Sequence, residues 1–488
     1  MFIGRKKELD FLNQKYNEKK GQLIVLYGRR RVGKTETLKQ FCKDKPHVFF
    51  SCTQTTDPVQ LAKFSSQLLR ENIPARQYIT EFSDWEKAFR AVSELPYGDN
   101  KKLIVIDEFP YMCKGNSSIP SILQNLWDME FKDSNVMIIL CGSSMSFIEK
   151  ELLAEKNPLY GRATGIYKME AMGFYDTAEF FPDYSPTDKI LTYSILGGVP
   201  HYLRQWDNQI SVGENIKKNI LTKDCVLYSE VEFLLHQELR EPAVYNSIIE
   251  AVALGGTKLN EISQKSLMDG ITKTSAYLKN LIELGIIKKE FSVDAEIKET
   301  SNRNRGLYKL TDNFFRFWYS FGYGNYSQLE DGDVEGVYKY IIEPELHRYA
   351  SLTFEDVCIE FIKELQKKEK LPFRYNKIGR WFGKTTVRDD KAKDGFKNAE
   401  TEIDILCMNK DKTKYLVGEC KFKNNPFSYS EYLNTAAKLT HQKNNAKFYY
   451  ALFSENGFDD QIVTESKKSE PQTLQLFTLD DIVNLKLL

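Results

Sequence analysis

The sequence predicts a multidomain α/β protein, and three observations lead to this fold class. The chain has 488 residues, which at about 150 residues per domain suggests three domains. The apolar residues 24–27 run directly into a glycine-rich stretch at 28–33, which is typical of a buried strand followed by a loop and a helix. Residues 402–406 and 415–422 alternate between apolar and polar side chains, as two strands of a second sheet would.

The overall charge of the protein does not indicate a strongly charged partner such as nucleic acid or a membrane surface. The 68 basic and 68 acidic side chains cancel, so any contact with nucleic acid must come from a local patch. The eight cysteines include no Cys-x-x-Cys pair, which argues against a zinc site or a disulfide framework. The sequence contains no signal peptide and no apolar run of about 18 residues. We therefore expect a soluble, cytoplasmic protein with no membrane partner.

The glycine-rich stretch has the spacing GxxxxGK[ST], which is the pattern of a phosphate-binding loop. Glycines at its two ends let the backbone wrap a phosphate, the lysine supplies a cation for the β- and γ-phosphates, and the threonine hydroxyl is placed to bind Mg²⁺. The alternative is a glycine turn with solvated basic side chains. The predicted nucleotide-binding residues are Gly28, Arg29, Arg30, Arg31, Val32, Gly33, Lys34 and Thr35.

Two carboxylates follow the apolar residues 103–106, which read as a buried parallel strand. Such a strand brings its carboxyl end to the nucleotide site. We expect Asp107 to join Thr35 in the Mg²⁺ shell and Glu108 to polarise the attacking water. An apolar run that ends in acidic residues is also common at ordinary strand ends, so this interpretation depends on the phosphate-binding loop.

Three further segments have both a functional and an ordinary structural interpretation. A hydroxyl at Ser143 or Ser144, after the strand-like residues 136–142, can sense the γ-phosphate or simply cap a turn. Arg162 follows a loop and is either a γ-phosphate finger, in cis or across subunits, or part of a surface ion pair. Gly4 and Arg5 open a helix that either packs over the nucleotide base or only presents a charged face.

As a set, residues 2–9, 28–35, 106–109, 142–144, 159–162 and 196–200 closely resemble the archaeal-type ATPases of the AAA+/STAND superfamily. The resemblance implies a P-loop parallel-sheet ATPase core at 1–165, a helical lid at 166–235, a winged helix and a variable C-terminal domain. It also implies that residues 5–8 flank the adenine, that Ser143 or Ser144 is the sensor, and that residues 197–200 belong to the lid; Gly4, Arg5 and Pro200 are therefore counted among the predicted nucleotide-binding residues.

Residues 236–325 have the pattern of a winged helix. Three helical segments at 243–253, 258–262 and 272–285 precede two short strand-like segments, and in DNA-binding versions the third helix enters the major groove. The alternative is a module that packs on the ATPase as a conformational relay. The candidate DNA contacts are Lys273, Thr274, Ser275, Lys279, Arg303 and Arg305.

Residues 333–488 form the last predicted domain. Side chains alternate along a strand, so Glu402 and Asp404 share one face of the first strand and Glu419 and Lys421 share one face of the second. Two carboxylates and a lysine at adjacent strand ends can bind a hard divalent cation and orient a water for phosphodiester hydrolysis. A solvated strand face is the alternative.

This spacing resembles the PD-(D/E)xK nuclease fold, a restriction-endonuclease-like α/β domain. The resemblance puts Asp404, Glu419 and Lys421 on the motif positions, with Glu355 as an additional carboxylate; Ile403 stands where the motif has proline. It implies Mg²⁺ or Mn²⁺ at Glu355, Asp404 and Glu419, with Glu419 and Lys421 as catalytic residues.

The sequence therefore predicts a protein that binds and hydrolyses ATP with Mg²⁺ and acts on DNA. The nucleotide state would control a metal-dependent nuclease-like domain. The alternative is a STAND-like regulatory switch whose C-terminal domain binds a partner or DNA without cutting. ATP and DNA are the expected partners, and a homo-oligomer is left open.

Overall fold

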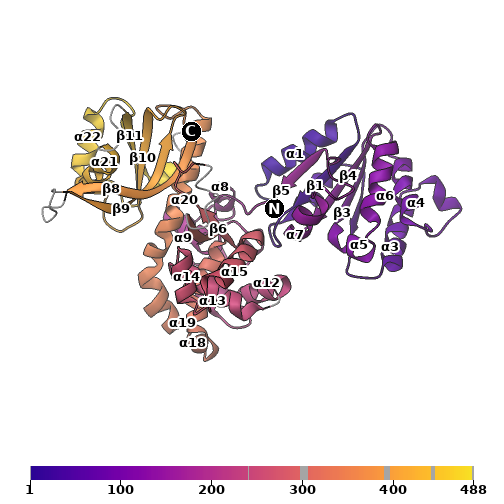
Figure 1. Ribbon diagram of the computed structural model, residues 1–488, viewed down its shortest axis with the longest axis horizontal. Helices are drawn as coiled ribbons and strands as arrows, with labels where there is room; N and C mark the ends of the chain where they lie inside the picture. Colours follow the sequence, from indigo (N-terminus) through magenta and orange to yellow (C-terminus); the bar gives the residue numbers. More distant parts are fainter. Residues whose placement is uncertain (1, 240, 297–305, 389–395, 441–445, 486–488) are drawn as a thin grey trace. The chain divides into compact units, whose positions relative to one another are not determined.

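The computed structural model describes residues 2–239, 241–296, 306–388, 396–440 and 446–485 (Figure 1). The chain divides into two compact units. The first comprises residues 1–172 together with 199–201, and the second comprises residues 173–198 and 202–488. Within the described residues, no helix is both long enough and apolar enough to cross a membrane.

The first unit is built on a five-stranded sheet in which every neighbouring pair is parallel, with the strand order β2-β3-β4-β1-β5. Parallel sheets are normally buried on both faces, and all residues of the central strands β1 and β4 are buried. The predicted P-loop α/β fold is confirmed. The strands are β1 (Gln22–Tyr27), β2 (His47–Ser51), β3 (Lys102–Asp107), β4 (Val136–Gly142) and β5 (Gly165–Lys168).

Helices cover both faces of this sheet (Figure 1). Alternate residues of β1 enter two separate cores, with Val25 in one and Ile24 in the other, because successive strand side chains point to opposite faces. Leu12 of α1 and Leu38 of α2 belong to the core around Ile24. The helices are α1 (Lys6–Asn17), α2 (Lys34–Cys42), α3 (Asp57–Leu69), α4 (Trp85–Arg90), α5 (Phe109–Gly115), α6 (Ile119–Leu126) and α7 (Met145–Phe147).

The segment after β5 is helical as far as a short hairpin. Strands β6 (Ile287–Glu290) and β7 (Leu307–Leu310) pair in antiparallel fashion, directly after three helices in the order that the sequence predicts. The helices are α8 (Phe174–Ala178), α9 (Pro186–Leu196), α10 (Pro200–Leu203), α11 (Val212–Asn215), α12 (Glu230–Glu238), α13 (Pro242–Ala253), α14 (Leu259–Lys265) and α15 (Ile271–Glu283).

An aromatic segment follows the hairpin and belongs to the core. Phe314, Phe315 and Phe317 are fully buried, since they lie on a helix that packs against α9. The helices of this part are α17 (Asn313–Phe317), α18 (Tyr326–Glu330), α19 (Val334–Val337) and the long α20 (Leu346–Lys367).

A second, mixed sheet forms the end of the chain, with the order β12-β11-β10-β9-β8. Strands β8, β9 and β10 are antiparallel neighbours, whereas β10, β11 and β12 run parallel because helices α21 and α22 connect them. The strands are β8 (Lys377–Arg388), β9 (Phe396–Met408), β10 (Lys414–Lys421), β11 (Lys447–Ser454) and β12 (Leu474–Thr478), and the helices are α21 (Tyr429–Thr440), α22 (Asp460–Lys468) and α23 (Leu479–Val483).

Candidate functional site: a phosphate-binding loop and a second acidic centre

The phosphate-binding loop joins the end of β1 to the start of α2. Gly33 has a φ of 90°, which favours glycine. A Cβ at Gly28 would lie only 2.2 Å from the carbonyl oxygen of Met169. The backbone at Met169 therefore comes so close that only glycine fits at position 28. The loop is thus shaped by its two glycines, as the spacing predicts.

The ammonium of Lys34 points into the curve of this loop. Its Nζ donates to the carbonyl oxygens of Gly28, at 2.8 Å, and Arg29, at 3.0 Å. Burial lowers the pKa of Lys34, while the negative charges of Asp107 and Glu108 oppose that shift. The cation is therefore held where the phosphates of a nucleotide would lie, as is usual for a phosphate-binding loop.

Thr35 and Asp107 meet at the carboxyl edge of the sheet. The Thr35 hydroxyl donates to Oδ2 of Asp107 at 2.7 Å, and the backbone N–H of Glu108 donates to Oδ1 at 3.1 Å. The carboxyl ends of parallel strands share one edge, so two residues that lie 72 positions apart come together. A hydroxyl and a carboxylate are ligands that Mg²⁺ prefers, and this pair fits the expected cation.

Glu108 is held by Ser143. The Ser143 hydroxyl donates to Oε2 of Glu108 at 2.9 Å, and its backbone N–H lies 3.4 Å from the same oxygen. Glu108 itself has a left-handed backbone with φ of 53° at the start of α5, which is uncommon for a residue other than glycine. The structure therefore fixes the direction of this carboxylate through the residue that the sequence suggests as a sensor.

Arg5 fastens the loop to the first helix. Its buried guanidinium donates to the carbonyl oxygen of Val32 at 2.6 Å, to Oε1 of Glu8 at 2.8 Å and to the carbonyl oxygen of Glu170 at 2.8 Å. Sequence reasoning placed Arg5 beside the adenine and missed this backbone contact. Of these contacts, only the ion pair with Glu8 has a local sequence signal, since the two residues lie three positions apart.

The other predicted nucleotide-binding residues lie around the loop. Val32 is buried and packs in the core between α1, α2 and the sheet. A Cβ at Gly33 would lie 3.5 Å from Cγ of Pro200, so Pro200 lies over the loop within the first unit. The remaining four are the half-buried Gly4, Arg29 and Arg30 and the exposed Arg31.

Arg162 forms the surface ion pair that the sequence left as an alternative. Its Nε and Nη2 donate to the carboxylate of Asp128 at 2.7–3.0 Å, and Nη1 donates to the carbonyl oxygen of Pro158 at 2.9 Å. These hydrogen bonds hold the pKa of Asp128 below its usual range. A role as a γ-phosphate finger stays a prediction and requires that Arg162 leave Asp128.

The second centre lies where β9 and β10 pair in the mixed sheet. The register pairs Gly418 with Ile405, which places Glu419 next to Asp404 across the two strands. The backbone N–H of Cys420 donates to Oδ2 of Asp404 at 2.8 Å. The sequence-predicted Asp404, Glu419 and Lys421 are thus brought together.

Two lysines neutralise Glu419. Lys421 Nζ donates to Oε1 at 2.8 Å and Lys438 Nζ donates to Oε2 at 2.7 Å. Burial opposes ionisation of Glu419, but the two ammonium charges outweigh it and lower its pKa. Burial and the charge of Glu419 raise the pKa of Asp404 to about 6. Sequence reasoning missed Lys438, because nothing in the spacing of α21 indicates which lysine turns toward the sheet.

Glu355 of α20 belongs to the same electrostatic neighbourhood. Burial raises its pKa to about 7; the charge of Arg380 opposes this shift and that of Asp404 adds to it. Arg380 Nε donates to Oε2 of Glu355 at 2.5 Å. Among the described residues, no group of three or more His, Cys, Asp or Glu side chains is arranged to hold a metal ion.

The candidate DNA contacts differ in accessibility. Lys273 and Lys279 of α15 are exposed and Ser275 is half-buried. Thr274 is fully buried, with its hydroxyl donating to Ser263 Oγ at 3.1 Å, so the expectation that it contacts DNA is wrong. Arg303 and Arg305 lie outside the described residues.

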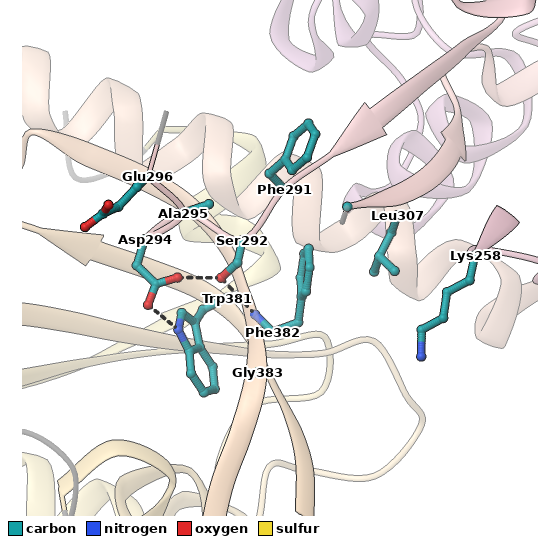
Figure 2. Close-up of a pocket in the computed structure, with 11 residues that line it drawn as sticks. Lys258, Phe291, Ser292, Asp294, Ala295, Glu296, Leu307, Trp381, Phe382 and Gly383 are labelled. Atoms are coloured by element: carbon teal, nitrogen blue, oxygen red, sulfur yellow. Dashed lines mark hydrogen bonds between the residues drawn. The ribbon is translucent and has the colours of Figure 1, made fainter. Parts of the chain in front are cut away.

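A cavity of about 720 Å³ lies between β8 and the segment after β6 (Figure 2). Three of its polar side chains bond to one another: Ser292 Oγ donates to Asp294 Oδ1 at 2.7 Å and Trp381 Nε1 donates to Asp294 Oδ2 at 2.8 Å. The lining residues are Lys258, Phe291, Ser292, Asp294, Ala295, Glu296, Gly306, Leu307, Trp381, Phe382 and Gly383.

The parallel sheet, the loop around Lys34 and the acidic pair Asp107 and Glu108 define the first unit as a P-loop ATPase domain. Residues 2–206 match the family described as an ATPase domain predominantly from Archaea. Residues 318–438 match the family described as "Archaea bacterial proteins of unknown function".

The chain is 32% identical over 425 residues to the uncharacterized protein MJECL04 of Methanocaldococcus jannaschii, and the match covers 87% of this chain and 88% of the relative. The chain therefore belongs to the same family as that archaeal protein. A stretch of 45 residues is 60% identical to the uncharacterized ATP-binding protein MJ0423 of the same organism, covering 9% of this chain and 76% of the relative.

Among solved structures, the Walker-type ATPase PABY2304 of Pyrococcus abyssi is similar at 19% identity and a TM-score of 0.48. That similarity covers 65% of this chain and 96% of the other.

Proposed function

We propose that this ATPase acts on DNA and that its nucleotide state controls a metal-dependent nuclease centre at Asp404, Glu419 and Lys421. The observation that carries the proposal is the position of these three side chains on two neighbouring strands. The order of elements from α20 through β8, β9, β10 and α21 to β11 is the αβββαβ order that the resemblance to PD-(D/E)xK nucleases requires.

At the ATP site, side chains of this protein would bind the phosphates of ATP, orient the attacking water and supply a base. Lys34 binds the β- and γ-phosphates, and Glu108, directed by Ser143, orients the attacking water. Thr35 and Asp107 would hold Mg²⁺, which neutralises charge on the phosphates. Because phosphoryl transfer depends mainly on positioning and charge stabilisation, these groups account for ATP hydrolysis.

We further propose that α13, α14, α15 and the hairpin β6–β7 form a winged helix that contacts DNA through α15. Three helices followed by an antiparallel hairpin support this assignment. The exposed Lys273 and Lys279 would contact phosphates, which position a protein on DNA without reading its sequence.

At the second centre, the carboxylate oxygens are of the type that Mg²⁺ and Mn²⁺ prefer, but in the structure those of Glu355 and Glu419 are bound by basic side chains, so a cation would have to displace these partners. Asp404, Glu419 and Glu355 would hold the cation, which polarises the phosphodiester when bound. Lys421 would leave Glu419 and stabilise negative charge on the phosphate, since its ammonium lies beside the acidic pair.

The test is cleavage of plasmid and single-stranded DNA with Mg²⁺ or Mn²⁺, in the presence and absence of ATP. We expect metal-dependent cutting by the wild type and its loss in Lys421→Ala. Lys423→Ala is the matched control, because Lys423 pairs with Glu431 and not with the acidic pair. Cutting that survives in Lys421→Ala would exclude this centre as its source.

A STAND-like switch is the second candidate. The observation that favours it is the internal neutralisation of the acidic centre, with both oxygens of Glu419 bound by lysines and Glu355 bound by Arg380. In that case ATP hydrolysis would be intact and no cutting would occur under any metal or nucleotide condition, while DNA or a protein partner would still bind.

A further inference from the structure

The cavity of about 720 Å³ beside β8 has the size of a small-molecule site. Two of the aromatic side chains that line it, Phe291 and Phe382, are only half-buried. Figure 2 shows their rings apart from the hydrogen-bonded group around Asp294. Both rings therefore offer apolar surface to a molecule that enters the cavity.

The strand register places Phe382 on the same sheet face as the acidic pair. Phe382 of β8 pairs with Glu402 of β9, and paired residues of antiparallel strands point to the same face. Asp404 lies two positions further along β9, so its side chain shares that face. Phe291 directly follows β6 of the hairpin. The cavity thus lies between the proposed winged helix and the strands of the second centre.

The charged groups at the cavity leave a cation accessible. Both oxygens of Asp294 accept hydrogen bonds from side chains of the cavity wall, and Glu296 is exposed, where water and salt screen its charge. The ammonium of Lys258 lies 3.8 Å from Glu400, and both of these side chains are more than half exposed. Such surface pairs are weak, so Lys258 can exchange Glu400 for the phosphate of a ligand.

We propose that this cavity binds an unpaired nucleotide of DNA, with the base against Phe291 and Phe382 and a phosphate on Lys258. Aromatic side chains bind single-stranded nucleic acid in this way, and they tolerate any sequence because every base has a π-face. A base inside a duplex must first leave its stack to reach such a site. The inference rests on the proposed action on DNA, and it identifies single-stranded or opened DNA as the form that lies beside the acidic strands.

The test is the binding of two fluorescently labelled probes to the full chain, measured by anisotropy in EDTA so that no DNA is cut. One probe is an oligothymidylate of about 20 nucleotides, which is longer than the usual site on a single strand, and the other is a blunt duplex of the same length. We expect Phe291→Ala and Phe382→Ala each to raise the Kd for the single strand about tenfold. The Kd for the duplex should stay unchanged.

Conservative variants separate stacking from an effect on folding. Phe291→Tyr and Phe382→Tyr keep a ring and should bind the single strand as the wild type does. Tyr340→Ala is the matched control, because this ring is 74% exposed and does not line the cavity; its loss should leave both Kd values unchanged. Circular dichroism and thermal melting establish that each variant folds. If Phe382→Ala does not fold, Phe382→Leu fills the space without a ring and should also weaken single-strand binding.

The role of Lys258 has its own readout. Lys258→Gln should lower the slope of log K against log salt for the single strand by about 0.7, the increment for one phosphate. An unchanged slope would overturn the phosphate contact.

Photo-cross-linking locates the base directly. A single strand that carries 5-iododeoxyuridine in place of thymidine should cross-link to Phe291 or Phe382, and mass spectrometry of the digested protein identifies the modified peptide. Cross-links found exclusively at other residues would overturn the inference.

The two probes separate this inference from the proposed function. If the duplex binds and the single strand does not, DNA binding stands and the stacking site is overturned. The same conclusion follows if the single strand binds equally well to the wild type and to the folded ring-deletion variants. If neither probe binds, the stacking site and the proposed action on DNA both fail.

Discussion

Glu108 is the side chain on which ATP hydrolysis should depend most strongly. Its carboxylate is held by Ser143 at 2.9 Å and lies next to the Thr35–Asp107 pair. Glu108→Gln keeps the shape but loses the basic oxygen, so we expect ATP to bind normally while kcat falls at least about 100-fold. Ser143→Ala should lower kcat less, by about tenfold, because the base remains but is no longer oriented.

A phosphate-release assay and a nucleotide-binding assay check this prediction. Glu149→Gln is the control, because Glu149 pairs with Lys168 outside the loop. This variant should hydrolyse ATP at the wild-type rate. Wild-type hydrolysis by Glu108→Gln would show that another group activates the water.

The carboxyl group of Asp404 should make stability depend on pH. Burial and the charge of Glu419 raise its pKa from 3.8 to about 6 in the folded state. The folded chain therefore binds this proton more tightly than the unfolded chain, so stability falls as pH rises from about 4 to about 6 and stays reduced above that. Asp404→Asn can still accept the Cys420 hydrogen bond without ionising.

We expect Asp404→Asn to stabilise the protein at pH 8 by about 3 kcal/mol and at pH 4 by less than about 1 kcal/mol. Urea unfolding at several pH values measures the difference. Glu402→Gln, on the same strand face but exposed, should have no such pH-dependent effect. A gain at pH 4 equal to that at pH 8 would mean that ionisation of Asp404 is not the cause.

At the residue scale, the sequence indicates those groups whose chemistry is local. Lys34, Thr35 and Gly33 follow from one motif, because the loop itself arranges them. Arg380 and Lys438 act on residues distant in the sequence, 25 and 19 positions from Glu355 and Glu419. Which basic side chain turns toward a buried carboxylate depends on packing, and no spacing rule predicts it.

Helix α15 is the element most directly suited to contact DNA. Lys273 and Lys279 are exposed on it, and each lysine that binds a phosphate adds a salt-dependent increment of affinity. The double substitution Lys273→Glu and Lys279→Glu should weaken DNA binding. It should also lower the slope of log K against log salt by about 1 for each phosphate that is no longer bound.

Fluorescence anisotropy with labelled duplex DNA at several salt concentrations checks this prediction. Lys339→Glu reverses one charge at an exposed position outside α15 and should change affinity little. If Lys339→Glu weakens binding by about half as much, in free energy, as the double substitution, which reverses twice the charge, then only net charge matters and α15 does not bind the DNA.

At the element scale, periodicity predicted the strands and helices well but not every exposed face. Apolar runs identified β1, β3 and β4, because a parallel strand is buried on both faces. Thr274 was misjudged since threonine is tolerated on either side of an amphipathic helix, and here its hydroxyl is satisfied inside by Ser263 and the carbonyl oxygen of Gly270.

At the scale of the whole molecule, the question is whether nucleotide and DNA binding are linked. The sequence distinguishes an ATPase part from a C-terminal part because each part has its own local motif. Linkage between ATP binding and DNA binding depends instead on how the affinities differ between conformations of the protein, and no local sequence pattern encodes that difference. If ATP changes the affinity for DNA by some factor, DNA must change the affinity for ATP by the same factor.

This reciprocity gives a direct test of control by nucleotide state. In the Lys421→Ala background, where we expect no cutting, the Kd for DNA with and without ATP and the Kd for ATP with and without DNA should change by one common factor, of about 5 or more. Adding Lys34→Ala should abolish ATP binding and the effect of ATP on DNA affinity, since it removes the cation for the phosphates. Lys43→Ala, at an exposed position just after α2, is the matched control. If DNA leaves the Kd for ATP unchanged while both ligands bind, ATP cannot control the affinity for DNA, and nucleotide state could act only on the rate of cutting.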